Sequence, residues 1–390
     1  MSNPFTPGFG TTPRIVIGRD EVIGQISRAF GAGFDPHRTT WLRSPRGTGK
    51  TVLLNEIQDL AGLAGWVVVQ EDAQTDGSWN ERIADRLELT QLAPARRRRI
   101  KAGSVSTPIG GASLELTDPA APTSGRGRSL RDVLERVLDQ TNPPKGVLIT
   151  VDEIHNSDRH ELAQFGNAIQ HLIRADRPVA VVLAGLPQLD PDDLATFLSR
   201  CTTPELDRIS DDAVRGGLQR TAELGGGRFA GDALELAVDI TAGYPYMLQL
   251  IGYWSWDHSR TGKISRNDVH QALPHCQREL TKSVLNGLDG TITPVGRTYL
   301  QAMAIDNGPS RTNDIATRIG KTPKYAGTYR QRLIDAGIIV AVDHGYVDFA
   351  IPGHRAQIRA DIATRPARPA ANSPIDPARE TGHDSGGEAL

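Results

Sequence analysis

Four short apolar runs rich in β-branched residues lie in the first half of the chain. Each run is bounded by polar or turn-forming residues, and this pattern predicts a strand buried on both faces of a sheet. The four runs are TTWLRS (39–44), GWVVVQED (65–72), GVLITVDE (146–153) and PVAVVLAG (178–185).

Amphipathic helical patterns separate these runs, because apolar residues recur there every three or four positions. The predicted helices cover residues 52–63, 80–89, 130–140 and 161–174. Strands that alternate with helices are typical of an α/β fold, in which helices cover both faces of a parallel sheet.

Only helical patterns follow from about residue 210 to residue 288, and they predict a separate helical domain without strands. The stretch SDDAVRGGL begins one of these helices, with Ser210 as its N-terminal cap.

Residues 291–352 have the pattern of a winged helix, in which three helices precede a β-hairpin. The helices are PVGRTYLQAMA, RTNDIATRIG and TPKYAGTYRQRLIDAG, and the hairpin IIVAVDHGYVDFAI turns at residues 343–345. Helix ends are predicted from capping residues, which are Thr312, Gly320, Thr322, Pro323 and Gly337.

The third helix of this module has two chemically different faces. Ala326, Tyr329 and Leu333 form an apolar face that is expected in the core. The opposite face is polar and basic, so it suits the major groove of DNA, with a protein or intramolecular contact as the alternative. The residues proposed for this contact are Lys321, Lys324, Thr328 and Arg332.

Composition is that of a globular protein, with 38% hydrophobic and 23% charged residues and a net charge of −2. No overall field therefore draws the chain to nucleic acid or to a membrane. Only 7 of the 44 basic residues are lysine, so arginine clusters carry less weight here. The apolar runs are too short to span a bilayer, MSNPFTPGFG lacks the features of a signal peptide, and a cytoplasmic protein is expected.

The eight residues SPRGTGKT (44–51) come between the first predicted strand and the first predicted helix. This context predicts a phosphate-binding loop, although the usual signature opens with glycine and this one opens with Ser44. Gly47 and Gly49 let backbone N–H groups face the β-phosphate of a nucleotide. Lys50 would reach oxygens of its β- and γ-phosphates. The predicted ATP-binding residues are Ser44, Pro45, Arg46, Gly47, Thr48, Gly49, Lys50, Thr51 and Val52.

A second motif, which is acidic, supports the prediction of a phosphate-binding loop. The strand VLITVDEIH ends in Asp152 and Glu153. An Asp at this place holds the hydration shell of Mg²⁺ together with the hydroxyl of Thr51, and the following Glu can polarise the attacking water. The two motifs together predict a P-loop NTPase that uses ATP and Mg²⁺, with Lys50 and Glu153 as catalytic residues.

The sequences VIGRDEVI (16–23), RGTGKT and VDE resemble the AAA+ branch of P-loop ATPases, and within it the initiator-like (origin-recognition-type) and STAND-type switches. AGYPYMLQLIGY (242–253) resembles the lid motif of that group, in which Pro245 packs near the adenine. The opening NPFTPGFG and the stretch from YAGTYRQRLIDAGII to YVDFAIP are similar to uncharacterised bacterial AAA-family ATP-binding proteins with a C-terminal winged helix. The resemblance covers nearly all of residues 3–352. The resemblance implies strand order 5-1-4-3-2, a helical lid and ATP as ligand.

Two departures from the AAA+ pattern predict a slow switch rather than a motor. Gln188 is the nearest polar residue to the usual sensor position after the fourth strand, and Tyr246 replaces an arginine that senses the γ-phosphate. Arg200 stands where AAA+ proteins carry an arginine finger directed at a neighbouring subunit, with an ordinary surface arginine as the alternative.

The expected organisation has five parts. A segment at 90–128 interrupts the ATPase core, with an arginine run at 96–99 that is either a nucleic-acid contact or a solvated surface, and a hairpin turn at 110–111. The parts are an arm at 1–14, the core at 15–207, the lid at 208–290, the winged helix at 291–358 and a disordered tail at 359–390.

The sequence thus predicts a slowly hydrolysing ATP-dependent switch whose winged helix contacts DNA weakly or a protein partner, and which forms homo-oligomers or binds another protein. A nucleotide-binding scaffold that does not hydrolyse ATP is the alternative. A helicase, suggested by DEIH, is not favoured, because residues 210–390 lack the pattern of a second RecA-like domain.

Overall fold

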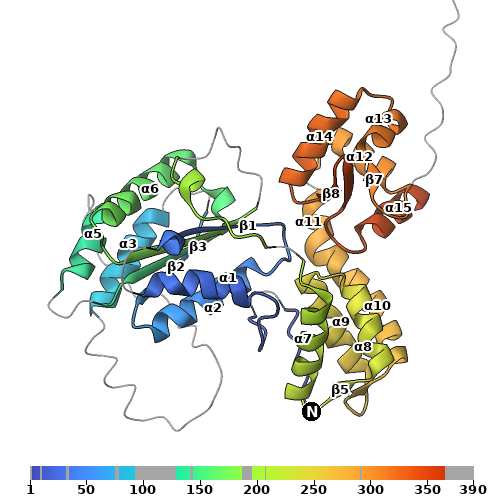
Figure 1. Ribbon diagram of the computed structural model, residues 1–390, viewed down its shortest axis with the longest axis horizontal. Helices are drawn as coiled ribbons and strands as arrows, with labels where there is room; N and C mark the ends of the chain where they lie inside the picture. The colour runs from blue at the N-terminus through green and yellow to red at the C-terminus, as the bar shows by residue number, and fades with distance from the viewer. Residues whose placement is uncertain are drawn as a thin grey trace, which may run out of the picture.

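The computed structural model of the chain consists of an α/β core, a helical lid and a C-terminal module (Figure 1). The structure describes residues 2–8, 11–31, 35–74, 79–92, 129–140, 144–186, 196–206, 208–289 and 292–364. Among the described residues, no helix combines the length and the apolar character needed to cross a membrane.

The core contains a parallel sheet of four strands in the order β1-β4-β3-β2. Just outside β1, Thr202 forms a single parallel bridge with Thr40. This is the order that the AAA+ resemblance implies, with the fifth strand reduced to one bridge. The strands are β1 (Thr39–Arg43), β2 (Val67–Asp72), β3 (Val147–Asp152) and β4 (Val179–Gly185).

Helices cover both faces of this sheet, so the predicted α/β fold is confirmed. Leu42, Leu148 and Val182 point to one face and pack with α1 and α2, whereas alternate strand residues such as Ile149 and Val181 pack with α3, α5 and α6. The core helices are α1 (Asp20–Ser27), α2 (Lys50–Leu63), α3 (Trp79–Leu92), α5 (Leu130–Leu138) and α6 (Arg159–Arg174). Short 3-10 turns are η1 (Arg28–Phe30), η2 (Pro36–Arg38), η3 (Ile154–Asn156) and η4 (Leu198–Arg200).

The lid is helical, but it also contains a small parallel pair of two-residue strands, β5 (Arg228–Phe229) and β6 (Lys263–Ile264). The prediction of a lid without strands was therefore wrong in this detail. Ser210 caps the first helix as predicted, since its side chain accepts from the backbone N–H of Ala213. The lid helices are α7 (Asp211–Leu224), α8 (Gly231–Thr241), α9 (Pro245–His258) and α10 (Arg266–Leu280).

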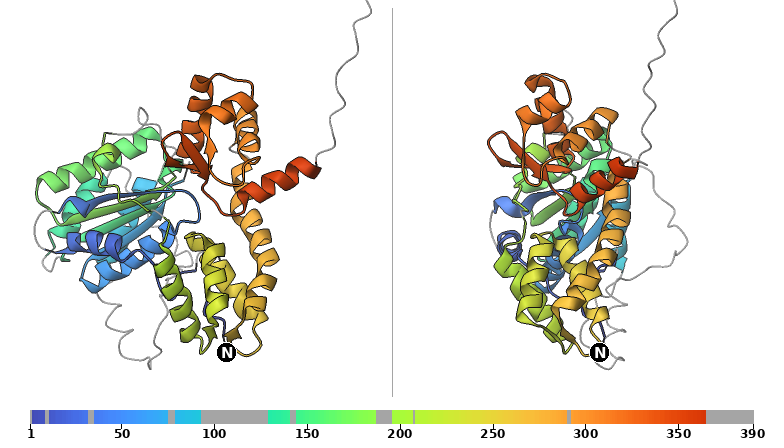
Figure 2. Two further views of the ribbon diagram at one scale, coloured as in Figure 1. Left: turned by 45° about the vertical axis from the view of Figure 1, so that its right-hand side comes forward. Right: turned by 90° about the vertical axis from the view of Figure 1, so that its right-hand side faces the viewer.

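Residues 2–8 pack on the lid although they precede the core in the sequence (Figure 2). Phe5 is buried and lies against Gly252, where a β-carbon would come within 2.3 Å of its ring. Asn3 donates to the carbonyl of Tyr253, and Gln249 accepts from the N–H of Thr6. The arm thus contributes to the core of the lid.

A π-helical turn, η5 (Thr281–Leu285), and α11 (Asn286–Asp289) continue α10 toward the C-terminal module (Figure 2). That module has a three-stranded antiparallel sheet in the order β7-β9-β8, with helices around it. Its elements are α12 (Pro294–Met303), β7 (Ser310–Arg311), α13 (Thr312–Arg318), α14 (Pro323–Asp335), β8 (Ile339–Asp343), β9 (Tyr346–Phe349) and α15 (His354–Thr364).

The capping residues predicted for this module are correct with one exception. The side chain of Thr322 caps α14 by accepting from Tyr325, and Gly320 and Gly337 have positive φ angles of 62° and 65° just past α13 and α14. Thr312, however, is the first residue of α13, and its hydroxyl donates to the carbonyl of Gly345 in the hairpin turn. It therefore joins the helix to the hairpin instead of capping.

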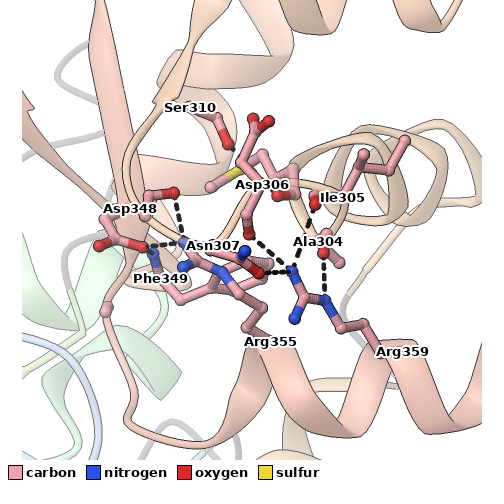
Figure 3. A network of polar contacts seen from close by, with 12 residues as sticks. Ala304, Ile305, Asp306, Asn307, Ser310, Asp348, Phe349, Arg355 and Arg359 are labelled. Atoms are coloured by element: carbon pink, nitrogen blue, oxygen red, sulfur yellow. Dashed lines mark hydrogen bonds and ion pairs between the residues drawn. The ribbon is translucent and has the colours of Figure 1, made fainter.

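The predicted disordered tail begins too early, because α15 includes residues 359–364. The guanidinium of Arg359 donates to the carbonyls of Ala304, Ile305 and Asp306 just past the end of α12, and Arg355 pairs with Asp348 (Figure 3). These contacts fix α15 on the module. The rest of the tail, the predicted arginine run and hairpin at 93–128, and Gln188 lie outside the described residues.

Candidate nucleotide site

The loop between β1 and α2 has the backbone that phosphate binding requires. Gly47 and Gly49 adopt positive φ angles of 73° and 89°, which favour glycine. Ser44 is not among the residues of positive φ, so a side chain is tolerated there. Its hydroxyl lies 2.6 Å from that of Thr48, which in turn donates to the carbonyl of Pro45. The departure from the usual signature therefore adds a hydrogen bond across the loop.

Lys50 begins α2 and is buried beneath the loop. Its Nζ donates to the carbonyls of Ser44, at 2.8 Å, and Pro45, at 2.7 Å. Burial lowers the pKa of Lys50 to about 8, against the opposite effect of Asp152 and Glu153. The ammonium is thus held where a phosphate could replace the two carbonyls as its partner.

Thr51 and Asp152 meet directly, since the hydroxyl of Thr51 donates to Oδ2 of Asp152 at 2.7 Å. Asp152 is buried at the end of β3, and Val52 follows in the first turn of α2. Mg²⁺ prefers one or two protein oxygens together with phosphates and water. The Thr51 and Asp152 oxygens fit that requirement, and no group of three or more His, Cys, Asp or Glu in the described part of the chain could hold a metal by itself.

Glu153 stands at the turn from β3 into η3 with an unusual backbone of φ 52° and ψ 35°. Its N–H donates to Oδ1 of Asp152 at 2.8 Å, which helps hold the turn. Burial and the neighbouring Asp152 raise the pKa of Glu153. Its carboxylate Oε2 lies 3.2 Å from Nδ1 of His155, a residue to which sequence reasoning gave no role. The only sequence signal for it was its place in the DEIH motif.

The start of the lid lies on the phosphate loop. The hydroxyl of Tyr244 donates to the carbonyl of Arg46 at 2.8 Å, and its ring leaves no room for a β-carbon on Gly47. The N–H of Tyr246 donates to the carbonyl of Gly47, and Pro245 lies beside Gly49. Tyr244 was not predicted as a site residue, although it is the central residue of the Gly-x-Pro turn.

The C-terminal module also reaches the loop. A β-carbon on Gly337, just past α14, would lie 2.8 Å from Cβ and Cγ of Pro45. At Gly287 in α11, a β-carbon would lie 2.7 Å from the guanidinium of Arg46. Arg208 connects the parts further, because it donates to Ala242 in the lid and to the carbonyls of residues 349 and 350 in the module. The phosphate loop therefore contacts both the lid and the C-terminal module, and the lid and the module are linked to each other through Arg208.

The remaining predicted residues take no part in the loop contacts described above. Arg200 is exposed at the end of η4, two residues before the bridge at Thr202. On α14, Lys324, Thr328 and Arg332 are exposed, and Arg332 lies over the ring of Tyr329. Lys321 is exposed in the preceding turn, over the ring of Tyr325.

Comparison with known proteins shows what the core is similar to. Residues 15–183 match a family described as AAA ATPase domain. A solved Walker-type ATPase of Pyrococcus abyssi superposes with a TM-score of 0.63 at 16% identity, covering 90% of this chain and 99% of that one. The fold is that of an AAA+ P-loop ATPase. In the C-terminal module of the present chain, residues 288–358 match a separate family, described as a domain of unknown function.

Two other solved structures resemble this chain more distantly. Cdc6p from Pyrobaculum aerophilum has a TM-score of 0.46 at 16% identity, covering 92% of this chain and 96% of that one. The RuvB Holliday junction branch migration motor of Thermotoga maritima has a TM-score of 0.41 at 18% identity, covering 88% and 95%. No curated protein matches the sequence.

Proposed function

We propose that the protein is a slow ATP-hydrolysing switch whose nucleotide state is read by the lid and the C-terminal module. The observation that carries this proposal is the packing of Gly337 against Pro45 in the phosphate loop. A loop that changes shape around a phosphate must move against that contact. The same loop carries Arg46, which contacts both Tyr244 and α11.

The site residues divide the chemistry among them. Lys50 and the backbone N–H groups of the loop bind the β- and γ-phosphates, and Glu153 polarises the attacking water. Thr51 and Asp152 would hold Mg²⁺, which supplies positive charge to the phosphates when bound. To bind ATP, Lys50 exchanges the carbonyls of Ser44 and Pro45 for phosphate oxygens, so binding alters the part of the loop on which Gly337 rests.

Slow turnover is expected because the lid has an uncharged side chain where related proteins have an arginine that senses the γ-phosphate. At the position after Pro245 the side chain is that of Tyr246, which carries no positive charge, and its backbone N–H is already bonded to Gly47. A cation that neutralises the charge developing on the phosphate is worth several orders of magnitude in related P-loop enzymes. Its absence from this position also favours the second candidate, a nucleotide-binding scaffold that does not hydrolyse ATP.

Gly337→Ala is expected to detach the C-terminal module from the loop. The new methyl group meets Pro45 at 2.8 Å, and the positive φ of 65° adds strain of about 1–2 kcal/mol. Detachment should raise the radius of gyration measured by small-angle X-ray scattering. It should also speed the exchange of a fluorescent ATP analogue several-fold, because the loop carbonyls that hold Lys50 are no longer supported.

Gly320→Ala is the matched control for this variant. Gly320 also follows a helix of the module with a positive φ, of 62°, but no atom of the part of the chain that the structure describes lies within 4 Å of a β-carbon placed there. It therefore carries the backbone strain without the clash. Equal exchange rates and radii in the two variants would contradict the proposed link between loop and module.

For the output module, we propose weak and sequence-tolerant binding of duplex DNA through α14. Arg318 does not contribute, because both of its terminal nitrogens pair with Asp306 at 2.7 Å. Lys321, Lys324 and Arg332 remain exposed. Three neutralised phosphates predict a slope of about −2.7 for log affinity against log salt.

Lys324→Ala combined with Arg332→Ala should weaken binding to all duplexes at low salt and reduce the slope to about −1, measured by fluorescence anisotropy on the full chain. The control replaces Lys263 and Arg266, two exposed basic residues of the lid, with alanine. If wild type and both double variants bind equally weakly at low salt, α14 serves a protein partner instead.

A further inference from the structure

His155 occupies a fixed place between two strand ends of the core. It belongs to η3, directly after β3, and Ile154 beside it is fully buried. The end of β4 lies against this turn, since a β-carbon on Gly185 would come within 2.7 Å of Ile154 and 3.4 Å of the backbone nitrogen of His155. Only 15% of the His155 side chain is exposed. The imidazole therefore has little freedom to turn away.

One nitrogen of this imidazole faces two groups. Nδ1 lies 3.2 Å from Oε2 of Glu153 and 3.4 Å from the backbone nitrogen of Leu186, which follows β4. Glu153 can only accept a hydrogen bond when ionised, whereas Leu186 can only donate one. With its proton on Nδ1 a neutral imidazole donates to Glu153, whereas with its proton on Nε2 it accepts from the N–H of Leu186 through Nδ1.

The surroundings favour the neutral ring. Burial lowers the pKa of His155, and the positive charges of Arg46 and Lys50 lower it further. A neutral ring with its proton on Nδ1 donates to a carboxylate without adding a positive charge beside Lys50. The interaction is then an orienting hydrogen bond and not an ion pair.

We infer that His155 is a positioning residue for Glu153, holding Oε2 so that the second carboxylate oxygen is directed to the attacking water. This inference rests on the proposed hydrolysis of ATP. The backbone angles at Glu153 fix the position of its β-carbon, and the contact with His155 fixes the position of its carboxylate. The contact with Nδ1 holds one end of a carboxylate that is half exposed, so loss of the imidazole gives the Glu153 side chain more freedom to rotate.

His155→Ala is expected to lower kcat for ATP about 10–100-fold, the usual cost of removing a group that orients a functional side chain. KM and the affinity for a fluorescent ATP analogue should change little, because the two polar contacts of His155 described above are with Glu153 and Leu186, which lie outside the phosphate loop. His155→Asn should recover most of kcat, since its side-chain amide N–H stands near the position of Nδ1. His160→Ala, an exposed histidine on α6, is the matched control and should behave as wild type.

The outcomes separate the inference from the function on which it rests. A wild-type rate no higher than that of Lys50→Ala contradicts both hydrolysis and the role of His155. Measurable wild-type turnover with an unchanged kcat in His155→Ala overturns the inference alone. Equal losses in the alanine and asparagine variants, or a rise in KM that matches the fall in kcat/KM, also overturn it, because either result indicates a merely structural role.

Discussion

Glu153→Gln should bind ATP as tightly as wild type and release phosphate about 10²–10⁴-fold more slowly, the usual contribution of a general base. The amide keeps the size of the side chain but cannot take a proton from water. Glu153 lies at the end of β3 beside Asp152, whereas the proposed ligands of the phosphates are the loop amides and Lys50. Binding and turnover are therefore expected to separate in this variant.

Lys50→Ala should instead lose affinity. A hydrogen bond to a charged group is worth about 1.5–3 kcal/mol. Its loss corresponds to a dissociation constant for ATP that is roughly 10- to 150-fold higher. Titration with a fluorescent ATP analogue measures this loss, and phosphate release by Lys50→Ala purified in parallel sets the background. Phosphate release by Glu153→Gln at the wild-type rate above that background would exclude Glu153 as the base. Tight binding with no turnover in any variant would favour the scaffold.

Arg200→Ala is expected to leave ATP binding intact and to lower hydrolysis wherever subunits meet. Fingers supplied by a neighbouring subunit are worth about 10³–10⁵ in rate in related P-loop enzymes. Arg200 is exposed at the end of η4, in the segment that leads to the bridge beside β1. Its guanidinium is thus available to another copy of the chain.

Concentration dependence distinguishes this role from that of a surface residue. Phosphate release per subunit should rise with protein concentration in wild type and remain flat in Arg200→Ala. Arg174→Ala removes an exposed arginine from the end of α6 and serves as the control. If wild type and Arg200→Ala show the same flat rate, Arg200 is not a finger, and the homo-oligomers expected from the sequence lose their support.

The core of the fold could be predicted because its signals are local. Strands buried on both faces, such as β3 and β4, read as continuous apolar runs, and the loop motif lies between β1 and α2. The two-residue strands β5 and β6 were missed because two residues have no periodicity. The helix α15 was not predicted, because the Arg359 contacts that hold it join residues more than 50 positions apart.

The same limit applies to the site. Lys50, Thr51 and Asp152 belong to motifs whose spacing gives their chemistry, and the structure brings Thr51 and Asp152 together. Tyr244 lies 198 positions from Arg46, its partner, and no spacing rule connects them. The contact of Gly337 with Pro45 is likewise a product of tertiary packing. His155 lies within a visible motif, but its relation to Leu186 appears only when β3 and β4 are placed side by side.

The arm at the start of the chain limits how far the lid can swing. Thr6 is bonded to the lid, and Thr12 is bonded to Asn55 on α2 of the core at 2.8 Å. The two threonines are six positions apart in the sequence, and that length of chain reaches at most about 20–22 Å when fully extended. A wider opening must break the exposed Thr12 bond or withdraw Phe5 from the lid, and burial of such a ring is worth about 1.5–3 kcal/mol. The arm therefore acts as a tether of fixed length, and lengthening it by a few residues would widen the range of lid angles without touching the site.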